Sequence, residues 1–382
     1  MSAALNTNLD TAIIGAGASG LAAAISAAAA GGSGVVLFER LPRAGKKILA
    51  TGNGRCNAGN IHALQHVYHN RVFALPALKQ FEIWAFFRSL GLLLREDAEG
   101  RLYPRSNTAA SVLDALRFGA LRAGAEIRCD TAVHEIKSTR EGFLLNGSIA
   151  ARRVIVAAGG CAAPAQGSDG SGFVLLKQLG HSIVKPQPAL VALRSDSPLL
   201  KMLKGLRCHA VISIEQNGET CRSAEGEILF TEDGISGIAA MEISRWAVPG
   251  AEAVLDLLPE MTLGQVHALL NELAQTCPEQ SLMGILPKRI GEAVQRQSER
   301  QGVHLAACLK RFVFPVTGTR GFANAQVTAG GADVAQFNPE TMESRLHKGL
   351  YACGEVLDVD GGCGGFNLQW AWASGQLAGK GS

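Results

Sequence analysis

The sequence has few charged and few aromatic residues, and neither sign of charge dominates. Asp, Glu, Lys and Arg make up 18% of its 382 residues and Phe, Trp and Tyr 5%, whereas hydrophobic residues reach 47%. So high an apolar share excludes a disordered chain. Because 36 basic residues nearly balance 33 acidic ones, the net charge of +3 gives no reason to expect a nucleic acid as partner.

Cysteine pairs at disulfide or metal spacing are also missing. The nine cysteines form no C-x-x-C pair and no Cys/His cluster at zinc spacing, and their number is odd. This pattern favours reduced thiols in a cytoplasmic protein over a disulfide framework, and we expect no metal site.

No segment has the composition of a membrane helix or a signal peptide. The stretch that comes nearest, residues 11–32, carries no charge, but it consists mainly of Ala and Gly and has no basic residue before it. We therefore expect a buried strand and helix there, and a soluble protein without a membrane partner.

Glycine is the residue in excess, with 45 copies in 382 residues, against a usual share of about 7%. Its first cluster separates the apolar run at residues 11–14 from an Ala-rich stretch, and it reads G-x-G-x-x-G from Gly15 to Gly20. A second apolar run, residues 35–38, ends in Glu39. The order strand, glycine turn, helix, strand and acid predicts a dinucleotide-binding βαβ unit.

Each part of this fingerprint has a physical reason. Gly15 permits a tight turn, Gly17 lets the backbone approach a pyrophosphate, and Gly20 allows the helix to pack closely on the sheet. The N–H groups at the start of the helix attract phosphate charge, and Glu39 is placed to accept hydrogen bonds from a ribose diol.

Three further segments decide between FAD and NAD. Residues 44–57 read AGKKILATGNGRCN, residues 354–360 GEVLDVD and residues 364–371 GGFNLQWA, and matches continue at residues 99–104 and 226–237. These motifs resemble the bacterial BaiN/aminoacetone oxidase-like family of FAD-dependent flavoproteins, over nearly the whole chain. The resemblance implies an α/β fold with a Rossmann-like two-dinucleotide-binding FAD domain, non-covalent FAD and oxidoreductase activity.

The resemblance and the fingerprint together predict the FAD-binding residues. The glycine-interleaved basic loop after residue 40 supplies donors beside the pyrophosphate, and the strand ending at residue 353 leads to an acid that faces the ribityl chain. A helix that begins after residue 364 faces the pyrimidine edge of the flavin. The predicted residues are Gly15, Gly17, Ala18, Ser19, Gly20, Glu39, Arg40, Lys46, Lys47, Thr51, Gly52, Arg55, Asn57, Val133, Ala158, Gly159, Gly354, Glu355, Gly365, Asn367 and Leu368.

An insertion interrupts this domain. An Asn-Gly pair at residues 217–218 predicts a hairpin, and Thr262 with Gln265 forms a capping box that begins a helix. Helical stretches follow around residues 281–297 and 303–311, and we expect the chain to rejoin the main sheet near residues 312–314. The expected domains are an FAD domain at 1–190 and 316–382, a β-barrel-like unit at 191–259 and a helical subdomain at 260–315.

The insertion contains no second strand-to-G-x-G-x-x-G pattern, so a separate NAD(P)H domain is not expected. Two enzyme functions stay open. NAD(P)H reduces the flavin, which then reduces an unsaturated or carbonyl-conjugated small molecule, or an amine-type substrate reduces the flavin and oxygen reoxidises it to give hydrogen peroxide. A third possibility is that FAD is a redox-sensing or scaffold ligand. Catalytic residues, substrate and oligomeric state stay open.

Several other side chains receive structural interpretations. We expect Cys56, Cys161 and Cys363 to be small buried residues, and His62 and His66 to lie on a surface helix face. Trp370 and Trp372 are expected to pack within the C-terminal helix. Arg101 and Tyr103 are candidates for the lining of the substrate cleft, and neither is assigned a catalytic role.

Overall fold

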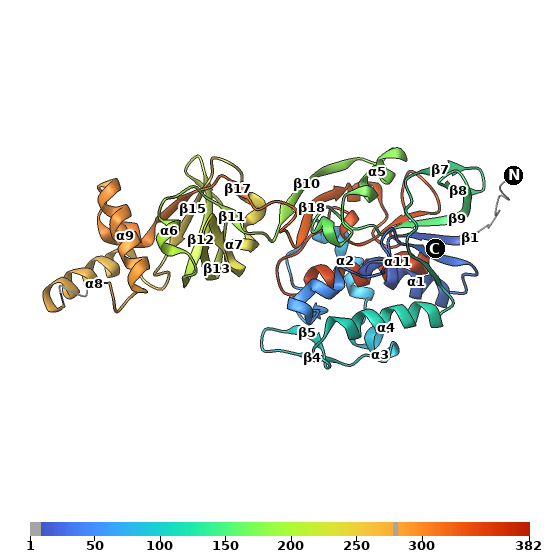
Figure 1. The fold of residues 1–382 in the computed structure, drawn as a ribbon, viewed down its shortest axis with the longest axis horizontal. Coiled ribbons are helices and arrows are strands. Elements are labelled where there is room, and N and C mark those ends of the chain that lie inside the picture. Colours follow the sequence, from blue (N-terminus) through green and yellow to red (C-terminus); the bar gives the residue numbers. More distant parts are fainter. Residues whose placement is uncertain (1–8, 278–281) are drawn as a thin grey trace. The chain divides into compact units, whose positions relative to one another are not determined.

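The computed structural model describes residues 9–277 and 282–382, which form two compact units (Figure 1). The first unit combines residues up to 187 with residues 327–382, and the second contains residues 188–326 apart from the undescribed stretch. The second unit is therefore inserted into the chain of the first, and each has its own hydrophobic core.

The main sheet of the first unit has a parallel core. Its strands follow the order β6-β2-β1-β9-β8-β7, with β19 also paired to β9. The five strands β6, β2, β1, β9 and β19 are parallel, and β8 and β7 extend the sheet antiparallel. Their bounds are β1 Leu9–Ile14, β2 Val35–Phe38, β6 Glu126–Arg128, β7 Ile136–Thr139, β8 Gly142–Leu145, β9 Ile149–Val156 and β19 Leu350–Ala352.

Strands β1, β2 and β19 are largely buried because they consist mainly of apolar residues, as parallel strands with both faces covered do. Residues 11–32 form β1 and the buried helix α1 (Ala18–Ala29), which confirms the interpretation of that uncharged stretch. Strand β6 ends at Arg128, so Val133, one of the predicted FAD-binding residues, lies beyond the end of the strand.

Helix α1 packs against the C-terminal helix α11 (Phe366–Gly381) at close range. A Cβ on Gly375 would lie 2.3 Å from the Ser19 carbonyl oxygen, and one on Gly379 2.3 Å from the Ala23 carbonyl oxygen. Only glycine permits this approach, so the two glycines set how closely the two helices pack.

Further elements complete the first unit. Its other helices are α2 Arg71–Gln80, α3 Ile83–Ser89, α4 Ala109–Arg122 and α5 Ser171–Gln178. Short antiparallel strands β3 Gly59–Asn60, β5 Arg101–Pro104 and β4 Leu94–Glu96 form a second sheet, and β10 Ile183–Ala189 pairs with β18 Val327–Ala332.

The second unit contains a seven-stranded sheet in the order β16-β15-β12-β13-β14-β11-β17, and its described pairs are antiparallel. The predicted hairpin is confirmed, since β12 and β13 turn at Asn217 and Gly218, both with positive φ. The bounds are β11 Leu193–Arg194, β12 Arg207–Gln216, β13 Glu219–Thr231, β14 Gly234–Ser236, β15 Glu252–Asp256, β16 Phe312–Pro315 and β17 Gly318–Thr319.

The expected return to the main sheet near residues 312–314 is wrong. These residues form β16, which pairs with β15 in the sheet of the second unit, and β17 pairs there with β11. Buried Phe312 and Phe314 belong to the core of this unit. The chain re-enters the first unit only with β18 at Val327.

Helices cover part of the second unit. The capping box at Thr262 is confirmed, because its side chain and that of Gln265 exchange hydrogen bonds with the backbone at the start of α8. The helix expected over 281–297 begins at Lys288 within the described residues, and Ser281 itself lies outside them. The helices are α6 Leu200–Leu203, α7 Ile238–Glu242, α8 Leu263–Thr276, α9 Lys288–Gln301 and α10 Leu305–Lys310. None of the helices in the described residues is long and apolar enough to cross a bilayer.

Candidate functional site

Four loops of the first unit follow parallel strands and meet at the carboxyl edge of its sheet. They are residues 15–17 after β1, 39–58 after β2, 157–170 after β9 and 353–365 after β19. Open α/β sheets bind ligands at this edge, because the loops there converge from neighbouring strands. The predicted FAD residues lie in these loops and the helix turns after them, except Val133, which follows β6 and is buried.

The three glycines of the first loop have different surroundings. Gly15 has φ +100°, and a Cβ there would lie 2.6 Å from the Ala157 carbonyl oxygen. A Cβ on Gly20 would lie 1.9 Å from the Gly15 carbonyl oxygen, whereas one on Gly17 would have no described atom within 4 Å. Gly15 and Gly20 therefore close the turn, and Gly17 leaves open space above it.

Helix α1 begins at this open space. Gly17 is its N-cap, and no side chain of the described chain caps the N–H groups that follow. Ala18 is partly exposed, and Ser19 is buried with its hydroxyl beside Gly354. Unpaired N–H groups at a helix start attract an anion, so the turn has room and donors for a phosphate.

Glu39 holds the turn from the end of β2. Its carboxylate accepts a hydrogen bond from the Ala16 N–H at 3.1 Å and another from the Leu41 N–H at 2.9 Å. A carboxylate has about four lone-pair sites, so Glu39 retains acceptor capacity for a ligand hydroxyl.

The basic residues after Glu39 are engaged with other loops of the same edge. Arg40 forms an ion pair with Asp169 at 2.6 Å, and Lys46 donates to the Ala165 carbonyl oxygen at 2.9 Å. Lys47 forms an ion pair with Glu355 at 2.9 Å. These side chains fasten loop 39–58 to loops 157–170 and 353–365.

The carboxylate of Glu355, the residue after Gly354, has two hydrogen-bond partners. One carboxylate oxygen accepts from Lys47, and the other accepts from the Thr328 N–H at 2.9 Å. A Cβ on Gly160 would lie 2.9 Å from this carboxylate and 2.3 Å from the Thr328 hydroxyl oxygen. Gly160 is therefore a glycine because Glu355 and Thr328 crowd it.

Residues 51–57 fold into a compact loop. The Thr51 hydroxyl donates to the Ile48 carbonyl oxygen at 2.7 Å, and Gly52 has φ +56° with a Cβ position 2.7 Å from the Asn57 N–H nitrogen. The Arg55 guanidinium lies over the Tyr103 ring, 5.1 Å from its centroid. Arg55 is exposed, and its Nε donates to the Gly52 carbonyl oxygen at 3.3 Å.

The start of α11 is a second uncapped helix end. Gly365 is its N-cap with φ +95°, and no side-chain cap is present in the described residues. The Asn57 amide oxygen would lie 2.6 Å from a Cβ on Gly365, and this buried oxygen has no hydrogen-bond partner among the described residues. A lone buried acceptor beside unpaired donors is costly unless a ligand satisfies it.

Asn367 shapes the loop before this helix end. Its amide oxygen accepts from the Gly361 N–H at 2.9 Å, and its amide nitrogen donates to the Gly361 carbonyl oxygen at 2.8 Å and the Gly362 carbonyl oxygen at 3.1 Å. Leu368 is partly buried against the core. The Asn367 side chain therefore holds the loop by bonding backbone groups of Gly361 and Gly362.

The remaining predicted residues follow β9. Ala158 and Gly159 begin the loop, and Gly159 has φ +73° with a Cβ position 3.0 Å from the Ser168 hydroxyl oxygen. They lie between the glycine turn after β1 and the loop after β19, because β9 is the strand between β1 and β19.

The open groups of this edge match the chemistry of FAD. A pyrophosphate needs N–H donors and space, and the uncapped start of α1 below Gly17 has both. The pyrimidine edge of a flavin presents one N–H between two carbonyl oxygens. The Asn57 amide oxygen and the uncapped N–H groups of α11 are the complementary acceptor and donors.

Burial raises the pKa of three cysteines near this edge. Burial raises the pKa of Cys56 to about 11, partly offset by a hydrogen bond with Thr51, and it raises the pKa of Cys353 to about 12. Burial and the nearby carboxylates of Glu355 and Asp169 raise the pKa of Cys161. Since the thiolate is the reactive form, these three thiols are packing groups.

The tryptophans of α11 also pack, as predicted. Both are buried, and their indole N–H groups donate to backbone oxygens, Trp370 to Gly354 at 3.2 Å and Trp372 to Ala58 at 2.8 Å. Arg101 forms ion pairs with Asp97 and Glu99, and Tyr103 is buried.

The expectation of a surface helix carrying His62 and His66 is wrong. Residues 61–66 form turns, and the His66 ring stacks on Phe366 with centroids 3.6 Å apart and planes 6° from parallel. Its Nε2 accepts from the Gly362 N–H at 2.9 Å, and burial lowers the pKa of His66 to about 4. His66 is therefore a neutral side chain that supports the glycine loop.

Sequence reasoning missed a second cluster on this segment. His69 and Asn70 both bond Asp358, which follows Glu355 in loop 353–365. The available signal was the acidic pair Asp358 and Asp360 directly before the glycines, but nothing in the sequence placed it beside residues 66–70.

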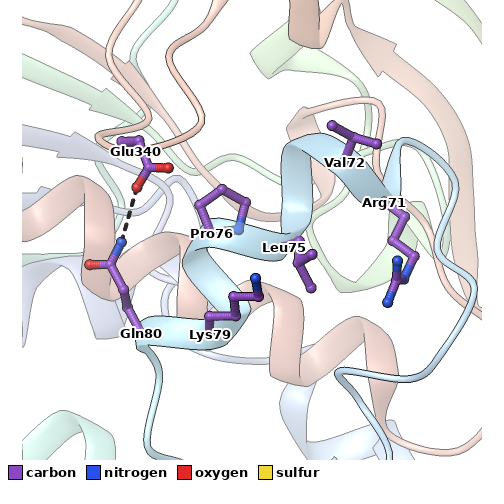
Figure 2. Close-up of a pocket in the computed structure, with 7 residues that line it drawn as sticks. All are labelled: Arg71, Val72, Leu75, Pro76, Lys79, Gln80 and Glu340. Atoms are coloured by element: carbon purple, nitrogen blue, oxygen red, sulfur yellow. Dashed lines mark hydrogen bonds between the residues drawn. The ribbon is translucent and has the colours of Figure 1, made fainter.

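A cavity of about 320 Å³ lies outside these loops, on helix α2 (Figure 2). Its wall includes apolar Val72 and Leu75, and Gln80 donates to Glu340 at 3.3 Å across one side. None of the predicted FAD residues lines it. The lining residues are Arg71, Val72, Leu75, Pro76, Lys79, Gln80 and Glu340.

Comparison with known proteins defines the class. The model of the family described as HI0933-like protein Rossmann domain matches residues 9–381, and the chain belongs to this family. It is an FAD-dependent oxidoreductase with a Rossmann-type domain. The 3-ketosteroid-Δ4-(5α)-dehydrogenase of Rhodococcus jostii RHA1 shares the fold, with a TM-score of 0.51, 15% identity, and coverage of 98% of this chain and 97% of that one.

Two sequence relatives extend over nearly their whole lengths. The chain is 39% identical over 399 residues to the 3-dehydro-bile acid Δ(4,6)-reductase of Clostridium scindens, covering 96% of this chain and 97% of the relative. It is 33% identical over 390 residues to the ribosomal RNA dihydrouridine synthase of Escherichia coli, covering 96% of each.

Proposed function

We propose that this protein is a reductase that uses NAD(P)H and bound FAD to saturate an electron-poor carbon–carbon double bond in a small organic molecule. The observation that carries the proposal is that relatives with different substrates share one type of reaction. A Δ(4,6)-reductase and a dihydrouridine synthase both add hydrogen to a double bond conjugated with a carbonyl group. The 39% identity to the first relative favours a small-molecule substrate over RNA.

FAD, when bound, supplies hydride transfer at N5 of its ring system. In our proposal, different predicted residues hold different parts of FAD. The N–H groups at the start of α1 would bind the pyrophosphate, and Glu39 would accept from the ribose. Asn57 would accept from the ring N–H, and the positive end of α11 would stabilise negative charge on the ring. The ion pair between Lys47 and Glu355 keeps two of these loops together.

The nicotinamide cofactor has no domain of its own in this proposal. The strand pairs described in the second unit are antiparallel, and no second strand–glycine turn–helix unit occurs in the described residues. NAD(P)H would therefore dock at the flavin in turn with the substrate, which predicts ping-pong kinetics.

A turnover experiment tests the proposal. The purified holoprotein is given NADPH or NADH without oxygen, together with a 3-oxo-4,6-diene steroid as one acceptor and a uridine-containing ribosomal RNA transcript as another. We expect the steroid to gain two hydrogens by mass spectrometry, with stoichiometric NAD(P)H loss. Reduction of the RNA without reduction of the steroid would identify RNA, and not a small molecule, as the substrate.

The alternatives give other results in companion assays of the same holoprotein. Hydrogen peroxide formed from a primary amine such as aminoacetone in air, without NAD(P)H consumption, would establish an oxidase. FAD binding without turnover of any acceptor or amine would favour the redox-sensing or scaffold function.

A further inference from the structure

A buried carboxylate holds a histidine beside the glycine loop. The Asp358 side chain is 6% exposed, and its Oδ2 lies 3.2 Å from Nε2 of His69, whose side chain is 38% exposed. The Asn70 amide nitrogen donates to the same Oδ2 at 3.2 Å and to the Asp358 carbonyl oxygen at 2.6 Å. Asp358 Oδ1 is buried and has no partner in the described chain.

This geometry determines which ring nitrogen of His69 faces Asp358 and which one is left open. Because Nε2 faces the carboxylate, it carries a hydrogen, and Nδ1 is the nitrogen left for other partners. Within residues 9–277 and 282–382, Nδ1 has no hydrogen-bond partner.

His69 is attached to the loop that precedes α11. Its backbone N–H donates to the Asp360 carbonyl oxygen at 2.8 Å, and three residues earlier His66 accepts from Gly362. Asn367, in the first turn of α11, bonds Gly361 and Gly362. The segment 66–70 therefore lies along the loop that leads to the proposed flavin contacts.

Neighbouring ionisable groups on this segment are unsuited to proton transfer near neutral pH. His66 uses Nε2 to accept from Gly362, and burial lowers its pKa to about 4. Burial raises the pKa of Tyr68 well above its usual range, and its hydroxyl donates to the Phe366 carbonyl oxygen at 3.2 Å. The other charged groups along this stretch are Asp358, Asp360 and Arg71, and Arg71 is bonded to the carbonyl oxygens of Leu64 and His66.

We propose that His69, held by Asp358, is the proton donor of the reaction. The inference rests on the proposed function. The substrate carbon β to the carbonyl receives a hydride, and the π-electron pair moves toward the α carbon and the carbonyl oxygen. His69 then gives the Nδ1 proton to the α carbon and becomes neutral. The substrate gains two electrons and two hydrogens, NAD(P)H loses the hydride, and solvent returns the proton to His69.

The first test needs no substrate. Holoprotein with ¹⁵N-labelled histidine is compared by NMR at one fixed pH, oxidised and after reduction with dithionite, with H69N used to assign the signal. We expect a larger protonated fraction of His69 in the reduced protein, because added negative charge on the flavin stabilises a nearby cation. Asp358→Asn should diminish the change, whereas an equal protonated fraction in both redox states would overturn the proposal.

The second test separates the two half-reactions. His69→Asn should slow reoxidation of the reduced flavin by the steroid acceptor about 100-fold or more, the usual contribution of a general acid, and leave reduction by NADPH unchanged. His62→Asn is the matched control, since His62 is an exposed histidine of the same segment. Unchanged reoxidation in H69N, with bound FAD and melting temperature retained, would overturn the assignment.

The two proposals fail in different ways. If the acceptor does not reoxidise the wild-type protein, the proposed function fails, and the NMR comparison still decides whether His69 senses the flavin. If wild type reduces the acceptor and His69 shows no redox response, only the inference fails.

Discussion

Glu39 and Glu355 each follow a parallel strand, but they differ in how much acceptor capacity remains. Glu39 accepts two backbone N–H groups of its own turn, whereas Glu355 is shared between Lys47 and the backbone of β18. A ligand hydroxyl can add to Glu39 without breaking an ion pair. At Glu355 it would compete with the ammonium group of Lys47.

Glu39→Ala should weaken FAD binding about 10-fold or more, because each hydrogen bond to a charged group is worth about 1.5–3 kcal/mol. Fluorescence of released FAD during dialysis measures the change. Glu39→Gln, which keeps an acceptor oxygen, should lose less. Equal FAD affinity in wild type and Glu39→Ala would remove Glu39 from the site.

The neutral state of His66 predicts a pH dependence. Its pKa falls from 6.5 to about 4 on folding, so the unfolded chain binds a proton that the folded chain rejects between these values. The contribution of neutral His66 to the free energy of unfolding is complete above pH 6.5 and declines as the pH falls toward 4. The lowered pKa of buried His181 acts in the same direction.

Thermal unfolding between pH 4 and pH 7 measures this effect. His66→Phe retains a ring to stack on Phe366 but cannot titrate, so its melting temperature should change less with pH than that of wild type. A melting temperature that falls as steeply with decreasing pH in the variant as in wild type would show that His66 does not contribute.

The sequence predicted residues at this edge that belong to local motifs, and it failed where distant segments meet. Gly15 to Gly20 and Glu39 lie within one βαβ unit, so their spacing carries their geometry. His69 and Asp358 are 289 residues apart, and their contact depends on how loop 353–365 lies against the segment before α2. A sequence contains no signal for such a contact.

Among the helices, α1 and α11 pack at a distance that two glycines of α11 permit. Gly379→Ala should destabilise the first unit by about 1–3 kcal/mol, because a Cβ 2.3 Å from the Ala23 carbonyl oxygen forces the helices apart. Chemical unfolding followed by tryptophan and flavin fluorescence reports the loss.

Gly264→Ala is the control, since a Cβ at this glycine of α8 would have no described atom within 4 Å. It should leave the protein at least as stable, because alanine costs less backbone entropy than glycine in a helix. Equal effects of the two substitutions would contradict the packing argument.

Element types were more predictable than element partners. The hairpin at Asn217, the capping box at Thr262 and the strand before Gly354 follow from local chemistry and are present. The apolar run at residues 312–314 is a strand as expected, yet it pairs with β15 in the inserted unit. A short apolar run such as Phe-Val-Phe predicts a buried strand, but it does not indicate with which sheet the strand pairs.

At the scale of the whole molecule, the chain combines one Rossmann-type unit with one inserted antiparallel unit. A second dinucleotide-binding unit does not occur among the described residues, and this is why we assign NAD(P)H to transient docking at the flavin. If NAD(P)H docks at the flavin in this way, a nicotinamide must reduce the holoprotein directly.

Anaerobic titration of the purified protein with NADH and then NADPH, followed at the visible flavin band, tests this requirement most directly. We predict that one of the two bleaches the band completely with one equivalent per FAD. A flavin band that persists with both nucleotides but is bleached by dithionite would contradict the nicotinamide-driven reductase, and a protein without a flavin band after incubation with FAD would contradict the site itself.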